Sequence, residues 1–279
     1  MADREIRLME PSANEISKLR DAYQQLENPS LAIRISSAVG MPVEAVTREL
    51  GKRAPEAVVD AVSQSTHKAL EFVLQSSMRS IKAEPQATAS PKWHTAAAMT
   101  TGAVAGFFGI QALIVELPLT TGIMFRSIAD IARAEGESPE DPETILNCMQ
   151  VFAMGSRASD KDDAAETSYY GVRLALGKAV TDALQYVASN RAGSVTAPAL
   201  LRLISALASR FGIVVTQKAM AQTIPVIGAI GGGLVNTVFI SHFQDMARAH
   251  FAIRALERKY GPDVIQSAYL RISSGEPAA

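Results

Sequence analysis

Hydrophobic residues recur every three or four positions along most of this chain, which is the spacing of one face of an α-helix. Polar residues with helix-starting or helix-ending chemistry separate these segments. The pattern predicts helices over 12–27, 55–81, 142–154, 169–189 and 242–260, with a further helical segment ending near Gly136 and a short one reaching 272. Residues 197–215 are apolar, interrupted by Arg202 and Arg210.

Three boundaries rest on specific chemistry. Ser12 and Glu15 have the spacing of a capping box, which predicts a helix start. Asp141 followed by Pro142 is typical of an N-cap and a first helical position. Gly261-Pro262 predicts the end of the last long helix.

Composition supports the same fold class. The chain of 279 residues has 45 alanines and only 6% aromatic residues. Alanine is the best helix former, whereas strands favour aromatic and β-branched residues. We therefore predict an all-α fold, a multi-helix bundle with two long apolar, glycine-containing helical segments packed centrally.

Those two segments carry no charged residue. The first uncharged stretch covers 95–115 and the second covers 219–241. Each is long enough to cross a bilayer, which needs about 20 residues, but both contain threonines, glutamine and several glycines, which gain little from insertion. Three interpretations stay open: buried core helices, a hairpin partly inserted into a membrane, or ordinary spanning helices.

The chain divides by composition into unequal parts. We expect a polar N-terminal helix and tail over 1–29, a helical domain over 30–262, and a short helix with a frayed tail over 263–279. Two prolines and small residues make 84–92 the clearest linker inside the domain. No apolar run near the N-terminus is long enough for a signal peptide, so the predicted cellular location is the cytoplasm.

Charge and cysteine content exclude several functions. The formal net charge of −1 gives no general attraction to nucleic acid, so no nucleic-acid partner is predicted. Cys148 is the single cysteine, which excludes an internal disulfide and a cysteine-cluster metal site. Motifs for zinc peptidases, serine hydrolases and dinucleotide binding are missing. We predict no cofactor, and no motif indicates a particular small-molecule ligand.

Two groups of polar residues are candidates for a site. His242 and Asp245 lie three residues apart, so one helix could present them together to a metal ion. His250 falls on an apolar helix face, which indicates a core histidine. A candidate polar network, set among apolar residues, comprises Glu116, Arg126, Asp130, Arg133, Asp245 and Arg248. A structural ion-pair network, a ligand or catalytic site, and a solvated helix face are the alternatives for it.

Spacing also predicts one helix contact. Asp130-Ile-Ala-Arg-Ala and Asp245-Met-Ala-Arg-Ala are near-identical pentapeptides, each following an uncharged stretch. We predict that the helix around 126–133 packs against the helix around 242–254, with Asp130 and Asp245 both turned inward.

The segment from Glu116 to Glu137, ELPLTTGIMFRSIADIARAEGE, closely resembles the signature of the EcsC family of bacterial proteins. Supporting matches are Asp141-Pro-Glu before Val151-Phe-Ala-Met-Gly, Tyr169-Tyr-x-x-Arg173, and the segments 224–236 and 243–258. The resemblance covers roughly residues 30–262. One departure is Ser138, where the family often carries an acid.

The family takes its name from the third gene of an operon that also encodes an ABC exporter. The resemblance therefore implies a helical, cytoplasmic or membrane-associated protein without an established activity. Our leading hypothesis is a non-enzymatic accessory or interaction protein at the inner face of the cytoplasmic membrane, with a membrane or membrane-protein partner and a connection to ABC-transporter function or secretion. The alternative is a metal-dependent hydrolase that uses Glu116, Asp130, His242 and Asp245 in a cleft between helices.

Overall fold

The computed structural model describes residues 10–27, 31–80, 110–155, 168–189, 196–224 and 232–276, and within them it contains helices and no strand. The all-α prediction is confirmed. The elements are α1 (Ala13–Glu27), α2 (Leu31–Val39), α3 (Val43–Leu50), α4 (Glu56–Ser80), α6 (Ile110–Ala134), α7 (Pro142–Gln150), the 3₁₀ turn η1 (Val151–Ala153), α9 (Tyr169–Ser189), α10 (Pro198–Gln222), α12 (Gly232–Tyr260) and α13 (Pro262–Ser274).

The predicted helix boundaries are set by the expected local chemistry. The Ser12 backbone N–H donates to Glu15 Oε2 at 3.0 Å, and the Glu15 N–H donates to Ser12 Oγ at 3.4 Å, which completes the capping box. Asp141 Oδ1 accepts from the Glu143 N–H at 2.9 Å. Gly261, at φ 91°, separates α12 from α13 in a conformation that favours glycine.

The second uncharged stretch is not one helix. Its first residues end α10 at Gln222, and its last residues begin α12 at Gly232, so the stretch is divided between two helices. Of the first uncharged stretch, 110–115 forms the start of α6; the remainder lies outside the described residues, as does the predicted linker 84–92. The helix predicted over 142–154 ends at Gln150 and continues as η1.

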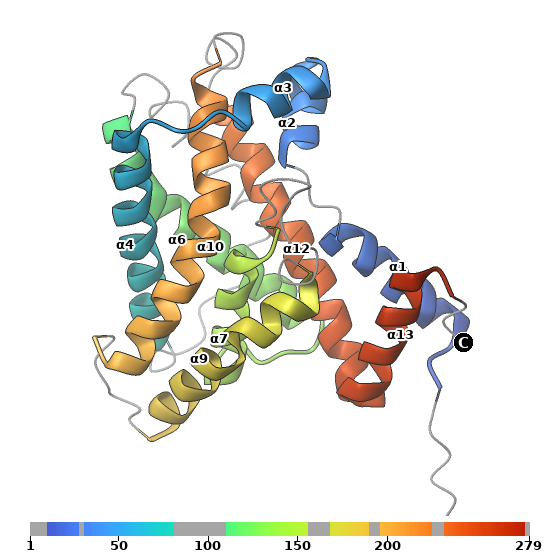
Figure 1. The fold of residues 1–279 in the computed structure, drawn as a ribbon. Helices are drawn as coiled ribbons and strands as arrows, with labels where there is room; N and C mark the ends of the chain where they lie inside the picture. The colour runs from blue at the N-terminus through green and yellow to red at the C-terminus, as the bar shows by residue number, and fades with distance from the viewer. Residues whose placement is uncertain are drawn as a thin grey trace, which may run out of the picture.

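The long helices α4, α6, α10 and α12 form the body of the molecule (Figure 1). Helix α4 packs against α6 and α10, and α6 packs against α12. Helix α9 lies against the beginning of α10, while α1 and α13 pack on the second half of α12. Helices α6 and α12 begin, and α10 ends, at the same end of this bundle.

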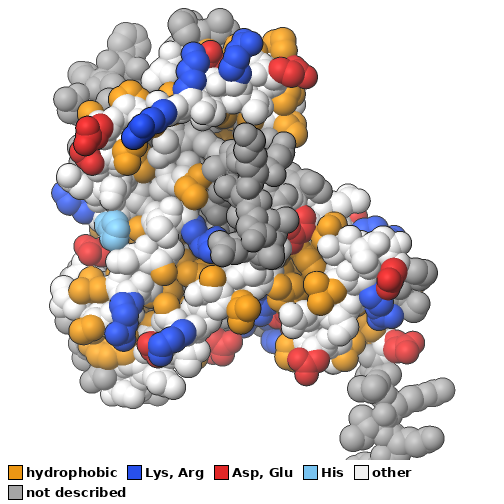
Figure 2. Space-filling view, in the orientation of Figure 1, with side chains coloured by type: hydrophobic (Ala, Val, Ile, Leu, Met, Phe, Trp, Pro, Cys, Tyr) orange, Lys and Arg blue, Asp and Glu red, His pale blue; other side chains and the backbone are white. Residues whose placement is uncertain are grey.

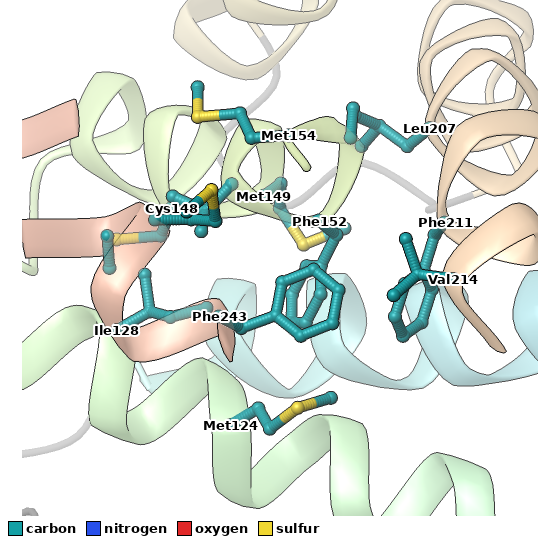
Figure 3. Packing of buried hydrophobic residues seen from close by; sticks show 14 of the residues in the cluster. Met124, Ile128, Cys148, Met149, Phe152, Met154, Leu207, Phe211, Val214 and Phe243 are labelled. Atoms are coloured by element: carbon teal, nitrogen blue, oxygen red, sulfur yellow. The ribbon is translucent and has the colours of Figure 1, made fainter. Parts of the chain in front are cut away.

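An aromatic core holds the middle of the bundle together (Figure 3). Phe152 of η1 lies 5.0 Å from Phe211 of α10 and 5.6 Å from Phe243 of α12, measured between ring centroids. Phe239 lies one turn before Phe243, at 5.2 Å. These four rings are fully buried, so the apolar surface that they remove from water stabilises the contact of η1, α10 and α12.

Candidate functional site

A fully buried lysine forms an ion pair at the end of the bundle where α6 and α12 begin and α10 ends. Lys218 Nζ lies 2.9 Å from Glu116 Oε1 and donates to Asn236 Oδ1 at 3.0 Å. The ammonium group also lies 4.9 Å from the centroid of the Phe239 ring, which adds a cation–π attraction. The three polar groups come from three helices, so their contact fixes how these helix ends meet.

Burial makes this contact energetically demanding. Removing an ammonium group and a carboxylate from water costs several kcal/mol for each ion, and only close, well-oriented pairing offsets that cost. The side chains of Lys218 and Glu116 are 0% and 5% exposed. Thr120 Oγ1 also donates a long hydrogen bond, of 3.5 Å, to Glu116 Oε1. The sequence pattern indicated Glu116 as a candidate but not its partners on α10 and α12.

The other members of the predicted polar network do not join Glu116. Asp130 pairs with Arg133 at 3.2 Å on the surface of α6. Arg126 is exposed and forms no ion pair with the residues that the structure describes. The network is therefore divided along α6, with one buried pair at its beginning and one half-exposed pair near its end.

Asp245 has its own cluster on α12. Its carboxylate accepts from Arg248, a member of the predicted network, and also from Arg34 of α2. The second arginine was not predicted, because α2 lies more than 200 positions away in the sequence. This cluster links α2 to the middle of α12.

Helices α6 and α12 do pack together, as predicted from their matching pentapeptides. Gln244 Nε2 donates to Ser127 Oγ at 2.8 Å between them, and Ile128 and Phe243 are both fully buried. The predicted inward orientation of the two carboxylates is corrected: the side chains of Asp130 and Asp245 are 19% and 27% exposed. Each lies at the edge of the helix contact and pairs with arginine at the surface.

This placement lowers the expected cost of removing either carboxylate. We expect Asp130→Ala and Asp245→Ala each to lower the free energy of unfolding by about 1 kcal/mol or less, because solvent screens half-exposed ion pairs. Urea unfolding at neutral pH measures the change. A loss of about 3 kcal/mol or more in either variant would contradict the surface placement described here.

His242 is fully buried beside the backbone of Gly155. Among the described residues, neither ring nitrogen has a partner with hydrogen-bond geometry. The nearby Gly155 backbone raises the pKa of the ring, but by less than burial lowers it. Burial, together with the positive charge of Arg34, lowers the pKa of His242 to about 4, so the ring is neutral near pH 7. A Cβ on Gly155 would lie 2.6 Å from His242 Nε2. Asp245, the predicted companion of this histidine, is engaged by two arginines.

His250 occupies the core position that its helix face predicts. Its Nδ1 lies 3.0 Å from Tyr169 Oη, and burial holds the pKa of His250 well below its usual value. Arg173 donates to the same tyrosine oxygen at 3.1 Å and forms two hydrogen bonds to Glu257, at 2.6 and 3.0 Å. Tyr170 Oη donates to Glu257 at 3.0 Å. These contacts tie α9 to α12.

The same cluster reaches the terminal helices. Glu27 at the end of α1 accepts from the Tyr169 backbone N–H at 3.0 Å and from Tyr269 Oη at 2.7 Å. The rings of Tyr170 and Tyr269 meet edge to face, with 5.0 Å between centroids. Helices α1, α9, α12 and α13 are therefore joined by one buried group of aromatic and ionic side chains.

A third ionic cluster lies at the corner between α6 and α7. Glu137 accepts from Arg254 Nε at 2.8 Å and also from Arg258, both on α12. Although burial alone would raise its pKa, these arginines hold the pKa of Glu137 below its usual value. Thr144 Oγ1 donates to the same carboxylate at 3.1 Å. The carboxylate thus stays ionised and anchors the corner to the second half of α12.

The candidate ligands do not form a metal-binding group in the described part of the chain. Among the described residues, no three His, Cys, Asp or Glu side chains lie close enough together to hold a metal ion. Glu116, Asp130 and Asp245 each face a different cationic partner, and His242 faces the backbone of Gly155. In this part of the chain the hypothetical metal-dependent hydrolase therefore has no cluster of ligands.

Comparison with known proteins identifies a family but no individual relative. Searches of curated proteins and of solved structures found no match to this chain. The model of the EcsC protein family matches residues 14–256, most of the chain, from α1 to near the end of α12. Glu116 and Arg173, which carry the resemblance, each join two helices through an ion pair, and Glu137 of the same signature joins the corner after α6 to α12. This chain belongs to the EcsC family.

Proposed function

We propose that this chain is an accessory protein that acts by binding, held at the inner face of the cytoplasmic membrane, and that its partner is a membrane protein. The operon context from which the family takes its name makes an ABC exporter the kind of partner that we favour. The proposal rests on where the uncharged sequence lies in the fold.

The observation that carries the proposal is the meeting of the two uncharged stretches. Glu116 directly follows the first uncharged stretch, Lys218 directly precedes the second, and Asn236 lies inside the second. Hydrogen bonds of 2.9 and 3.0 Å join these residues, so the described parts of both stretches lie at one end of the bundle. Helix ends that carry no charged residue of their own suit a position next to a bilayer, where charged side chains are costly.

Helix α10 supports the same proposal. Its 25 residues, Pro198–Gln222, are long and apolar enough to cross a membrane, and it is the one helix among the described residues that meets this test. Only 44% of its most apolar window is buried. Its exposed residues all lie in its first half, so α10 supports the proposal by its length and composition alone; they are Pro198, Leu201, Arg202, Ser205 and Ser209.

Exposed apolar side chains occur on the elements at this end. Val43 of α3 and Val59 in the first turn of α4 are 36% and 48% exposed, and Leu119 near the start of α6 is 51% exposed. Single exposed apolar residues are ordinary on protein surfaces. At this end they lie beside exposed charges on or next to the same elements, among them Arg48, Lys52 and Glu56, and this mixture favours peripheral contact.

Cell fractionation tests the proposal. We expect the full-length protein to sediment with membranes at high speed, and purified protein to float with lipid vesicles in a density gradient. Washing the membranes with high salt and then with alkaline carbonate distinguishes peripheral contact from insertion. Recovery entirely in the high-speed supernatant, together with no vesicle binding, would refute the proposal.

A further inference from the structure

A long central part of the sequence is strongly biased toward positive charge. Residues 167–244 contain six Lys or Arg and a single acidic residue, Asp182. The whole chain, by contrast, has 27 Lys or Arg and 28 Asp or Glu. Two of the six cations are used inside the fold, since Arg173 pairs with Glu257 and Lys218 with Glu116. Of the remaining cations, two lie together on one surface.

That surface is formed where α9 meets the beginning of α10. Lys178 of α9 and Arg202 of α10 have side chains 89% and 65% exposed. Both lie near Asp182, at 3.7 and 3.5 Å, distances too long for strong charge-assisted hydrogen bonds. With Ala175 and Ala179 these side chains line an open hollow of about 330 Å³. One carboxylate between two cations leaves the hollow positively charged.

Two exposed leucines are next in sequence to residues that line this hollow. Leu174, one turn before Lys178 on α9, is 84% exposed, the highest exposure among the large hydrophobic residues that the structure describes. Leu201, next to Arg202 on α10, is 38% exposed. Figure 2 shows cationic side chains beside hydrophobic ones over the lower ends of α9 and α10. We name Leu174, Lys178, Leu201 and Arg202 the α9–α10 surface.

We propose that the α9–α10 surface binds the anionic headgroups of phospholipids, with Lys178 and Arg202 contacting phosphate and the two leucines entering the lipid interface. This inference rests on the proposed membrane function and names the lipid chemistry that it would use. Cations next to exposed apolar side chains suit a negatively charged bilayer surface, because electrostatic attraction and apolar burial then act together. Leucines would gain little on a nucleic acid, whose exposed surface is dominated by phosphate.

The position of this surface also bears on how the protein would meet the bilayer. Helix α10 begins at the α9–α10 surface and ends where the two uncharged stretches meet (Figure 1). Contact at both places therefore requires α10 to lie along the bilayer surface and not across it.

Vesicle binding of the intact chain tests the inference. The probes are vesicles of phosphatidylcholine alone and vesicles of equal amounts of phosphatidylcholine and phosphatidylglycerol, each at low and high salt. We expect the parent protein to bind the anionic vesicles at least about tenfold more tightly, and salt to reduce this preference, because salt screens exposed charges.

Variants locate the contact. Lys178→Glu/Arg202→Glu should lose the preference for anionic vesicles, and Leu174→Ser/Leu201→Ser should weaken binding to both kinds of vesicle. Lys18→Glu/Arg271→Glu, which reverses exposed cations on α1 and α13, is the matched charge control, and Leu270→Ser of α13 is the matched leucine control. Both controls should bind like the parent protein. Thermal melts of every variant confirm that it is folded.

The outcomes separate this inference from the proposed function. If the parent protein binds no vesicle at all, the proposed membrane function fails and this inference fails with it. If the parent binds but Lys178→Glu/Arg202→Glu binds equally well, or the control pair loses as much, the α9–α10 surface is not the contact and the proposed function stands. Binding of duplex DNA through Lys178 and Arg202, without anionic-vesicle preference, would also overturn the inference.

Discussion

Replacing the buried lysine should give the largest loss of stability in this protein. We expect Lys218→Met to lower the free energy of unfolding by about 3–5 kcal/mol, because it leaves the buried carboxylate of Glu116 without its cation. Asn236 would lose a donor at the same time. Urea unfolding followed by circular dichroism measures the change.

Two controls identify the cause of that loss. Lys178→Met removes an exposed lysine from α9 and should change stability by no more than about 0.5 kcal/mol. The double variant Glu116→Leu/Lys218→Met removes both charges, so it should recover most of the stability, since apolar replacements of buried ion pairs are often neutral. A Lys218→Met loss below about 1 kcal/mol, or a double variant that loses more than the single one, would show that the pair is not the buried contact described.

Adding one methyl group at Gly155 should give the second large effect. Gly155 has φ 70°, which disfavours other residues, and a Cβ there would lie 2.6 Å from His242 Nε2 and 3.3 Å from Met246 Sδ. The backbone contributes about 1–2 kcal/mol and the overpacked site about 1–3 kcal/mol. We therefore expect Gly155→Ala to destabilise by about 3 kcal/mol, measured by urea unfolding.

Gly40→Ala separates the two contributions. Gly40 has a similar φ of 68°, but nothing lies within 4 Å of the position that a Cβ would take, so this variant carries the backbone cost alone. The difference between the two variants then reports the contact with His242. Equal losses at Gly40 and Gly155 would mean that the histidine moves aside without cost.

The helices were predictable from sequence where their chemistry is local. The capping box at Ser12, the N-cap at Asp141 and the stop at Gly261 involve residues within a few positions of one another, and each forms as expected. The second uncharged stretch was predicted as one helical segment, although Pro225 and the run Gly231-Gly232-Gly233 inside it are typical of a helix boundary. Helix α10 ends before Thr223, and α12 starts at Gly232.

The candidate site depended on contacts that sequence spacing does not encode. Arg34 reaches Asp245 from α2, and Lys218 reaches Glu116 across 102 positions. A signal for the second pair exists all the same. Glu116 is the single Asp, Glu, Lys or Arg within 93–125, and Lys218 is the single one within 211–244. Opposite charges isolated in two apolar runs are expected to pair once both runs are buried.

Site-specific labelling tests the membrane contact most directly. Cys148 is fully buried and burial raises the pKa of its thiol, so a cysteine introduced at the surface reacts with a maleimide dye selectively. A polarity-sensitive dye is attached at Leu119→Cys near the start of α6 and, in a second variant, at Leu270→Cys on α13. We predict that vesicles shift the emission of the Leu119→Cys label to the blue and leave the Leu270→Cys label unchanged. No shift at Leu119→Cys under conditions where the protein floats with the vesicles would contradict the proposed membrane-facing end.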